Sequence, residues 1–190
     1  MKSTIRTYFI LLFLFVPFSN AFADEYKDTI DIFKKAGASN AFFGENYGYA
    51  VFPTIGKGGI GIGGAYGSGK VYKDGKYMGN TDMYQLSLGL QLGGQAFSQI
   101  IFFQDARAFE QFTGGSFEFG AQASAVAITA GASATASTSG VSAGTSAGNK
   151  NADTVGNSYY RGMAIFTIAK GGLMYEASVA GQTFTYTPKK

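Results

Sequence analysis

The first periodic segment of the chain, residues 24–43, has the spacing of an amphipathic helix. Its apolar and small residues recur every three or four positions, at Tyr26, Ile30, Phe33, Gly37 and Ala41. This spacing places them on one helical face and leaves most of the charged residues elsewhere. We expect the helix to end or break at Gly37, because glycine is favoured at helix ends.

The next part of the chain has the patterns of β-strands. Tyr49–Phe52 is a short apolar run, and residues 56–69 are rich in glycine with Ile60 and Ile62 at strand spacing. Asp74-Gly75 is a two-residue hairpin turn between Val71 and Tyr77. From Tyr84 to Leu92, apolar and polar or glycine positions alternate without a break, which predicts a strand.

A second group of elements follows. The run Ile100–Phe103 predicts a strand that is buried on both faces. Asp105 is a suitable N-cap for a short helix, near Ala106 to Phe112, that carries Phe109 and Phe112. Further strands are expected at 117–119, 159–168, 173–179 and 184–186. A strand of small residues could extend to about 132.

These elements predict a mainly β (α+β) fold in a single domain of residues 24–190. We expect a curved, Gly-rich antiparallel sheet or partly closed barrel, with an N-terminal amphipathic helix and one short helix. Residues 133–157 are almost all small or polar, so this low-complexity segment is predicted to be mobile.

An internal echo relates Gly48–Ile60 to Gly162–Leu173. Each copy reads as a strand, a Lys-Gly-Gly turn and a second strand, which would place Lys57 and Lys170 at comparable turn tips. The alignment requires Pro53 to be looped out. Because proline cannot donate a ladder hydrogen bond, we expect a bulge or an edge position there.

The composition excludes several kinds of catalytic and metal site, because the chain has neither cysteine nor histidine. Ser-His-Asp and Cys-His catalysis, Cys/His zinc sites and disulfides are therefore excluded. Gly59–Gly64 and Gly64–Lys70 imitate nucleotide-binding motifs, but neither is followed by a predicted helix. Asp105 is better explained as a cap, and Glu110 as a solvated helix residue, than as a hydrolytic acid pair. We therefore predict a protein that is not an enzyme and has no cofactor or metal.

The N-terminus has the pattern of a secretory signal peptide. Lys2 and Arg6 precede the apolar run Tyr8–Phe18, and Ala21-Phe22-Ala23 is a cleavage motif. Cleavage would leave residues 24–190 in the periplasm or secreted. The apolar run is too short to form a helix that spans the membrane. Cleavage also removes two of the 15 basic residues and none of the 12 acidic ones, so the remaining chain is nearly neutral. Nucleic acid is thus not an expected partner.

Lysines gather around the Gly-rich strands and suggest a lipid-binding surface. The candidate cations are Lys57, Lys70, Lys73, Lys76 and Lys170. The candidate interfacial aromatics are Phe42, Phe43, Tyr47 and Tyr49. Lysines attract anionic phospholipids, and aromatic rings suit the boundary between headgroups and water. The same lysines could equally be solvated turn residues.

Several segments in order resemble the SYLF domain family, and together they span nearly all of the chain after the leader. They are Gly48–Pro53, Lys57–Gly59, Ile60–Gly64, Gln91–Gly94, Ile100–Phe103, Phe117–Ala121, Ala130–Ala132, Gly172–Met174 and Gly181–Tyr186. The resemblance implies binding to anionic lipids, and actin binding in some eukaryotic members. It also implies that the N-terminal helix contributes to membrane contact. We do not expect actin as a partner of an exported chain.

The hypothesis from the sequence is therefore an exported, non-enzymatic domain that contacts anionic phospholipid headgroups, on a membrane surface, through lysines in Gly-rich turns. Two alternatives remain open. One is a small integral outer-membrane β-barrel, which the alternation at Tyr84–Leu92 permits. The other is a structural or stress-response module that binds proteins.

Overall fold

The computed structural model describes residues 21–60, 62–88, 93–120, 123, 125–128, 159–170 and 179–190. Within them the helices are α1 (Ala21–Lys35), α2 (Gly37–Asn40), the 3₁₀ turn η1 (Ala41–Phe43) and α3 (Ala106–Thr113). The strands are β1 (Gly48–Ile60), β2 (Ile62–Lys73), β3 (Lys76–Leu88), β4 (Gly93–Phe103), β5 (Ser116–Glu118), β6 (Val126–Ile128), β7 (Met163–Ala169) and β8 (Gln182–Pro188). The expected strand at 173–179, apart from Val179, and the whole low-complexity segment 133–157 lie outside the described residues.

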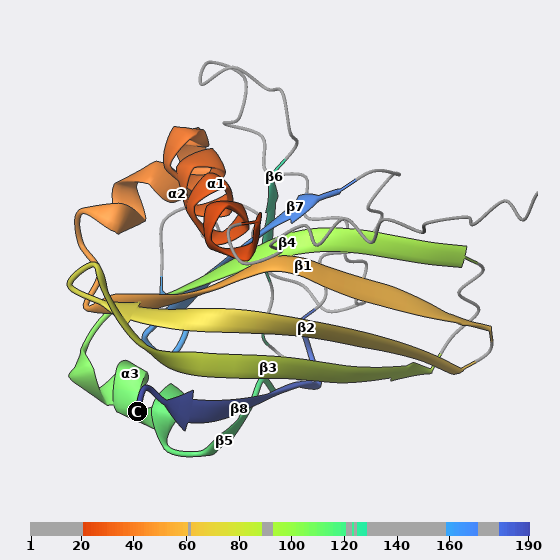
Figure 1. Ribbon diagram of the computed structural model, residues 1–190. Coiled ribbons are helices and arrows are strands. Elements are labelled where there is room, and N and C mark those ends of the chain that lie inside the picture. Colours follow the sequence, from red (N-terminus) through yellow and green to blue (C-terminus); the bar gives the residue numbers. More distant parts are fainter. Residues whose placement is uncertain are drawn as a thin grey trace, which may run out of the picture.

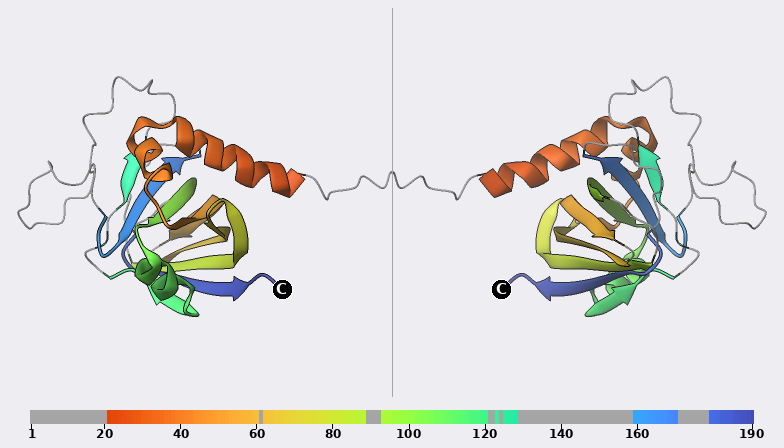
Figure 2. Two further views of the ribbon diagram at one scale, coloured as in Figure 1. Left: turned by 90° about the vertical axis from the view of Figure 1, so that its left-hand side faces the viewer. Right: turned by 90° about the vertical axis from the view of Figure 1, so that its right-hand side faces the viewer.

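The described strands form one mixed eight-stranded sheet in the order β5-β8-β3-β2-β1-β4-β7-β6. The long strands β1 to β4 lie side by side (Figure 1), and the sheet is strongly curled when it is seen end-on (Figure 2). This confirms the mainly β fold with a curved sheet. One detail differs, since β6 pairs with β7 in parallel rather than antiparallel.

Two local predictions about the backbone are confirmed. Asp74 and Gly75 form the β2–β3 turn and both have positive φ, at 50° and 72°. These are the angles that a tight hairpin turn requires. Pro53 lies at a bulge, because the register of β1 shifts between Val51 and Ile55 against β2 and between Phe52 and Ile55 against β4.

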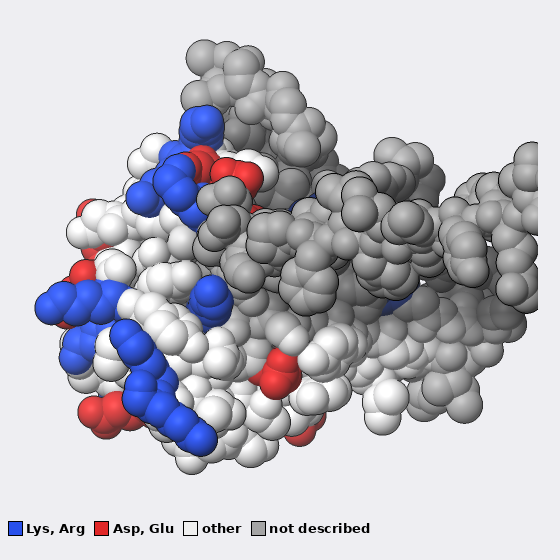
Figure 3. All heavy atoms as spheres, viewed as in Figure 1, with Lys and Arg blue, Asp and Glu red and all other residues white. Residues whose placement is uncertain are grey.

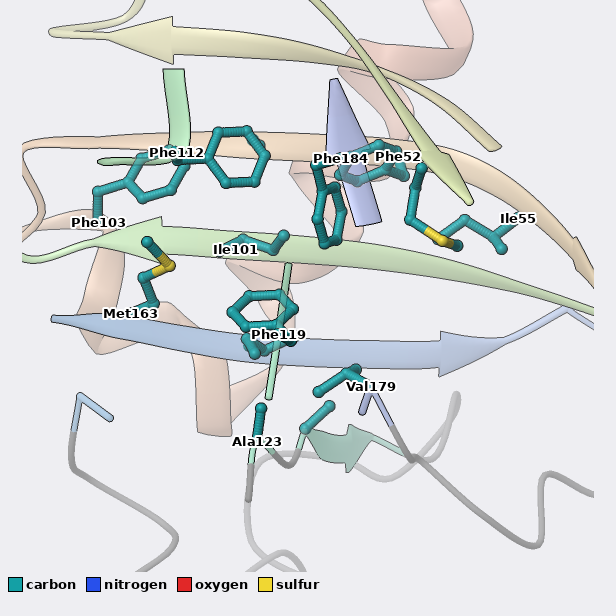
Figure 4. Close-up of a cluster of buried hydrophobic side chains, with 14 of the residues drawn as sticks. Phe52, Ile55, Ile101, Phe103, Phe112, Phe119, Ala123, Met163, Val179 and Phe184 are labelled. Carbon is teal, nitrogen blue, oxygen red and sulfur yellow. The ribbon is translucent and has the colours of Figure 1, made fainter. Parts of the chain in front are cut away.

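The core lies on both faces of the sheet, and β4 contributes to each. Ile101 and Phe103 belong to the cluster inside the curl, together with Phe52 and Phe184 (Figure 4). Ile100 and Phe102 belong to a second cluster, on the outside. All four residues of the run 100–103 have 0% exposure, as the sequence predicts for a strand buried on both faces.

The inner cluster is closed by α3. Asp105 caps this helix, because its carboxylate accepts a hydrogen bond of 2.8 Å from the backbone N–H of Ala108. Phe112 is fully buried and packs against Phe103 and Phe184, with ring centroids 4.9 and 5.2 Å apart. The short helix and its cap are therefore confirmed.

A buried polar pair spans the inside of the curl. Gln99 of β4 and Gln182 of β8 each donate an amide hydrogen bond to the other, at 2.9 and 3.2 Å. Both side chains are fully buried. The side chain of Gln85, on β3, donates to the carbonyl oxygen of Ala180 at 2.9 Å. These bonds satisfy polar groups that would be costly to bury alone, and they connect distant strands.

The outer cluster is covered by α1, α2 and η1 (Figure 1). Tyr26, Ile30 and Phe33 pack on the sheet as the helical spacing predicts. The helix ends at Lys35 and a second one begins at Gly37, which confirms the expected break. The rest of the predicted apolar face is wrong. Gly37 and Ala41 are exposed because the chain changes direction there and buries Phe42 instead.

The internal echo has a structural counterpart, but the turn that it predicts at Lys57 is wrong. The first strands of the two copies, β1 and β7, pair with opposite edges of β4. Lys57, however, lies inside β1 rather than at a turn, because Gly58 and Gly59 continue the ladder to β2 and β4. Lys170 does follow the end of β7.

Candidate functional site

Lysines and aromatic rings meet at the end of the sheet that carries the β2–β3 turn. Lys73, the last residue of β2, has its ammonium nitrogen 4.2 Å from the ring centre of Tyr47 and donates a hydrogen bond to the Tyr47 hydroxyl. This bond raises the pKa of Lys73 above its ordinary value, so the lysine stays charged. The Tyr47 ring lies against Phe109 of α3, with centroids 5.6 Å apart.

Lys70 has a similar environment on the outer face of β2. Its ammonium nitrogen lies 4.3 Å from the ring centre of Tyr26, on α1, and 5.6 Å from that of Tyr77, on β3. Lys189 lies over Tyr77 at 5.8 Å. Cation–π contacts of this kind hold a lysine in place without neutralising its charge.

Lys73 and Lys76 are direct partners in the antiparallel ladder, on either side of the two-residue turn. Like charges directly opposite one another are unfavourable in a sheet. Figure 3 shows basic side chains at this end of the molecule, at the left of the view, with a few acidic ones among them. We call Lys70, Lys73 and Lys76 the hairpin surface.

Three of the four predicted interfacial aromatics border this end of the sheet, namely Tyr47, which contacts Lys73, and also Tyr49 and Phe43. Tyr49 stacks on Tyr72 at 5.2 Å, and burial raises the pKa of Tyr49 to about 12. Phe43 is half-buried and contacts both Tyr49 and Lys34. Phe42 is instead a core residue, 6% exposed, with its ring against Phe102, Tyr159 and Phe166. It lies too deep to be an interfacial residue.

The structure does not bring the other two predicted lysines to the hairpin surface. Lys57 lies nine residues along β1 from Gly48, the partner of Lys73, a separation of about 30 Å in a strand. Lys170 pairs with Glu25 of α1 at 3.2 Å and donates to Thr54 at 2.7 Å. Its contacts fasten α1 to the sheet at the Pro53 bulge.

The acidic residues considered as a catalytic pair are not arranged for that role. Asp105 serves as the helix cap, and Glu110 is exposed. Among the described residues, no group of His, Cys, Asp and Glu could hold a metal ion. A depression of about 310 Å³ lies between α3, β5 and the turn before β7, and its lining residues do not include Lys70, Lys73 or Lys76. No helix in the described part of the chain is long and apolar enough to cross a membrane.

Sequence reasoning missed two partners of the hairpin surface. The helical spacing predicts that Tyr26 lies on the buried face of α1, yet its ring also supports Lys70. The position of Lys189 beside Tyr77 depends on the pairing of β8 with β3, which the sequence does not show. Only the pairing of distant segments reveals these contacts.

Comparison with known proteins gives a family and one curated relative. The chain is 27% identical over 157 residues to beta cell expansion factor A of Aeromonas veronii, an alignment that covers 82% of this chain and 51% of the relative. The chain thus spans about half the length of that protein. Residues 84–189 match the Ysc84 family, described as "Las17-binding protein actin regulator".

The matched stretch contains the end of β3, all of β4 to β8 and α3, whereas β1 and β2 precede it. The family is not known for enzymatic activity, and it supports a lipid-binding or protein-interaction module. Its name refers to the actin and Las17 binding of eukaryotic members. Because the match covers more than half of the sequence, this chain belongs to the Ysc84 family, whose domain is also called SYLF.

Proposed function

We propose that this chain is an exported, non-enzymatic protein that binds the headgroups of anionic phospholipids through the hairpin surface. The observation that carries the proposal is the direct pairing of Lys73 with Lys76. Two like charges in register destabilise a hairpin. A phosphate group between the two ammonium groups would remove this repulsion and accept charge-assisted hydrogen bonds from both.

The neighbouring aromatic rings suit a position at a membrane surface. Tyr26, Tyr47 and Tyr77 each contact a lysine of the hairpin surface. Tyrosine favours the headgroup region, where its ring and its hydroxyl are both accommodated. Each lysine near an anionic membrane contributes about 1 kcal/mol. The three lysines would therefore support a reversible association that weakens at high salt.

The helix that family resemblance associates with membrane contact is not needed in this mechanism. The apolar residues of α1 that the structure describes, Tyr26, Ile30 and Phe33, pack on the sheet. Its lysines, Lys27, Lys34 and Lys35, lie on the exposed side. The helix would thus remain docked and would support Lys70 through Tyr26 while the hairpin surface contacts lipid.

Two matched variants test the proposal. The first replaces Lys70, Lys73 and Lys76 with glutamine, and the second replaces Lys27, Lys34 and Lys35 with glutamine. Each loses the same charge, so a non-specific electrostatic effect would weaken both equally. We expect only the hairpin variant to lose binding to phosphatidylglycerol vesicles, by about 100-fold, given about 1 kcal/mol for each lysine.

The opposite pattern would assign the contact to α1, and unchanged binding of the hairpin variant would refute the proposed site. Circular dichroism of both variants shows whether the sheet is intact.

The export part of the proposal has its own test. When the full chain is expressed in a bacterium, the protein in the periplasmic fraction should begin at Asp24. An uncleaved protein in the cytoplasm would contradict it.

A further inference from the structure

The outer face of β3 is apolar where a solvated sheet is usually polar. Gln85 points into the curl and is buried, whereas its neighbours Tyr84 and Leu86 point outward. Tyr84 is 48% exposed and Leu86 is 85% exposed. An antiparallel sheet with one solvated face normally directs apolar residues inward and polar residues outward. At this end of β3 the arrangement is reversed.

Neighbouring strands extend the apolar face. Tyr66 of β2 is the ladder partner of Tyr84; it is 51% exposed, and the two rings lie 5.2 Å apart. Gly56 on β1 and Gly64 on β2 continue the same face and add no side chain above the backbone. We call Tyr66, Tyr84 and Leu86, with these glycines, the outer-face patch. Among the described residues it contains no charged side chain.

We propose that the outer-face patch enters the interfacial layer of a phospholipid bilayer, so that β2 and β3 lie parallel to the membrane plane. This inference rests on the proposed function and specifies how the protein is oriented on the lipid. Leu86 would reach the acyl chains, and the two tyrosine rings would lie at the headgroup level.

The charge on the same face favours a lipid bilayer as the occupant. Lys70 lies on the outer face of β2, four residues from Tyr66, and this spacing is about 13 Å along a strand. In an anionic bilayer on this face, the phosphates would contact Lys70 and the apolar layer would contact the outer-face patch. Figure 3 shows basic groups at the left of the molecule.

The acidic group between the two regions is already engaged. The Asp82 carboxylate accepts hydrogen bonds from Ser68 at 2.7 Å and from the Tyr66 hydroxyl at 3.3 Å. These bonds compensate part of the cost of bringing the carboxylate near a membrane. They also anchor the polar end of the Tyr66 ring and leave its apolar edge available.

A fluorescent label on Leu86→Cys tests the orientation, because the chain has no other cysteine. The control label is on Gln111→Cys, which lies on α3 and is exposed beside the depression. The protein is used in the cleaved form that begins at Asp24, which retains every contact described above, since the first of them is made by Glu25. With phosphatidylglycerol vesicles, we expect the emission of an environment-sensitive dye to shift to the blue at position 86 and to stay unchanged at position 111.

Unlabelled variants give a second measurement. Leu86→Gln should weaken vesicle binding about tenfold. Ile32→Gln removes a similarly apolar side chain, 49% exposed on α1, and should have no effect. If vesicles bind the protein but position 86 shows no shift and Leu86→Gln binds normally, the inference is wrong although the proposed function stands. If the natural chain does not bind vesicles at all, both fail. A shift that depends on protein concentration without vesicles would identify a second copy as the occupant and overturn the inference.

Discussion

The ammonium nitrogen of Lys70 lies 4.3 Å from the ring centre of Tyr26, so a helix near the N-terminus supports a lysine of the β2–β3 hairpin. Tyr26 also packs with the outer cluster beneath α1. The same residue therefore contributes to helix docking and to the position of the hairpin surface. Changes that release α1 should affect the lysine as well.

The first prediction concerns alkaline stability. Burial raises the pKa of both Tyr26 and Tyr49 from 10.0 to about 12 in the folded protein. Because the folded state holds these protons more tightly, their contribution to stability is complete below pH 10 and is lost as the pH rises toward 12. We expect tyrosinate absorbance to develop late at these two residues. The double variant Tyr26→Phe/Tyr49→Phe should lose less stability over this range, and an equal loss would contradict the assignment.

The second prediction concerns acid. A hydrogen bond from Thr54, together with the neighbouring Lys170, lowers the pKa of Glu25 below its ordinary value. The resulting stabilisation is present above the unfolded pKa of about 4.5 and disappears as the pH falls through the lower folded pKa. Urea unfolding between about pH 6 and pH 3 should show a smaller acid loss for Glu25→Gln than for the natural chain. If Glu25→Gln and the natural chain lose the same stability over this pH range, the contacts of Glu25 with Thr54 and Lys170 contribute nothing to the stability.

The third prediction concerns the amide pair inside the curl. Gln99→Leu leaves the buried amide of Gln182 without its partner, and should lower the free energy of unfolding by about 1–3 kcal/mol. Adding Gln182→Leu to Gln99→Leu should lower the free energy of unfolding by less than Gln182→Leu does in the natural chain. Thr167→Val is the control, because the Thr167 hydroxyl is buried without a hydrogen-bond partner in the described part of the chain. Additive losses in the double variant would refute the coupling of β4 and β8.

The fourth prediction concerns two glycines of neighbouring strands. A methyl group at Gly69 would meet the Phe52 ring at 2.6 Å and the Val51 carbonyl oxygen at 2.9 Å. Gly69→Ala should therefore destabilise the fold by about 1–3 kcal/mol. At Gly56 a methyl group would meet nothing within 4 Å, so Gly56→Ala should be tolerated. Thermal unfolding compares the two, and equal melting temperatures would contradict the packing described here.

Local patterns were sufficient for much of the fold. Adjacent residues are enough to predict the buried run Ile100–Phe103, the Asp105 cap and the Asp74-Gly75 turn. The structure has each of them. The parallel pairing of β6 and the position of Lys57 inside β1 depend on long-range contacts. A glycine-rich stretch is compatible with a turn or a strand, and only its partners decide between them.

The candidate site was harder to predict, for the same reason. The sequence identifies Lys70, Lys73 and Lys76 as neighbours, because they lie on one predicted hairpin. It does not reveal that Lys57 is remote or that Lys170 is paired with Glu25. The sequence shows that apolar and polar residues alternate around Tyr84 and Leu86. Which of these two groups of residues faces inward depends on the buried contacts of Gln85.

Vesicle flotation of the cleaved chain, without detergent, tests the central claim most directly. Phosphatidylglycerol and phosphatidylcholine vesicles are compared at low and high salt. We predict that the protein floats with phosphatidylglycerol only, and less at high salt, because exposed lysines contact the phosphates. A soluble, folded protein that remains at the bottom of the gradient with both lipids would contradict lipid binding and point to protein partners instead.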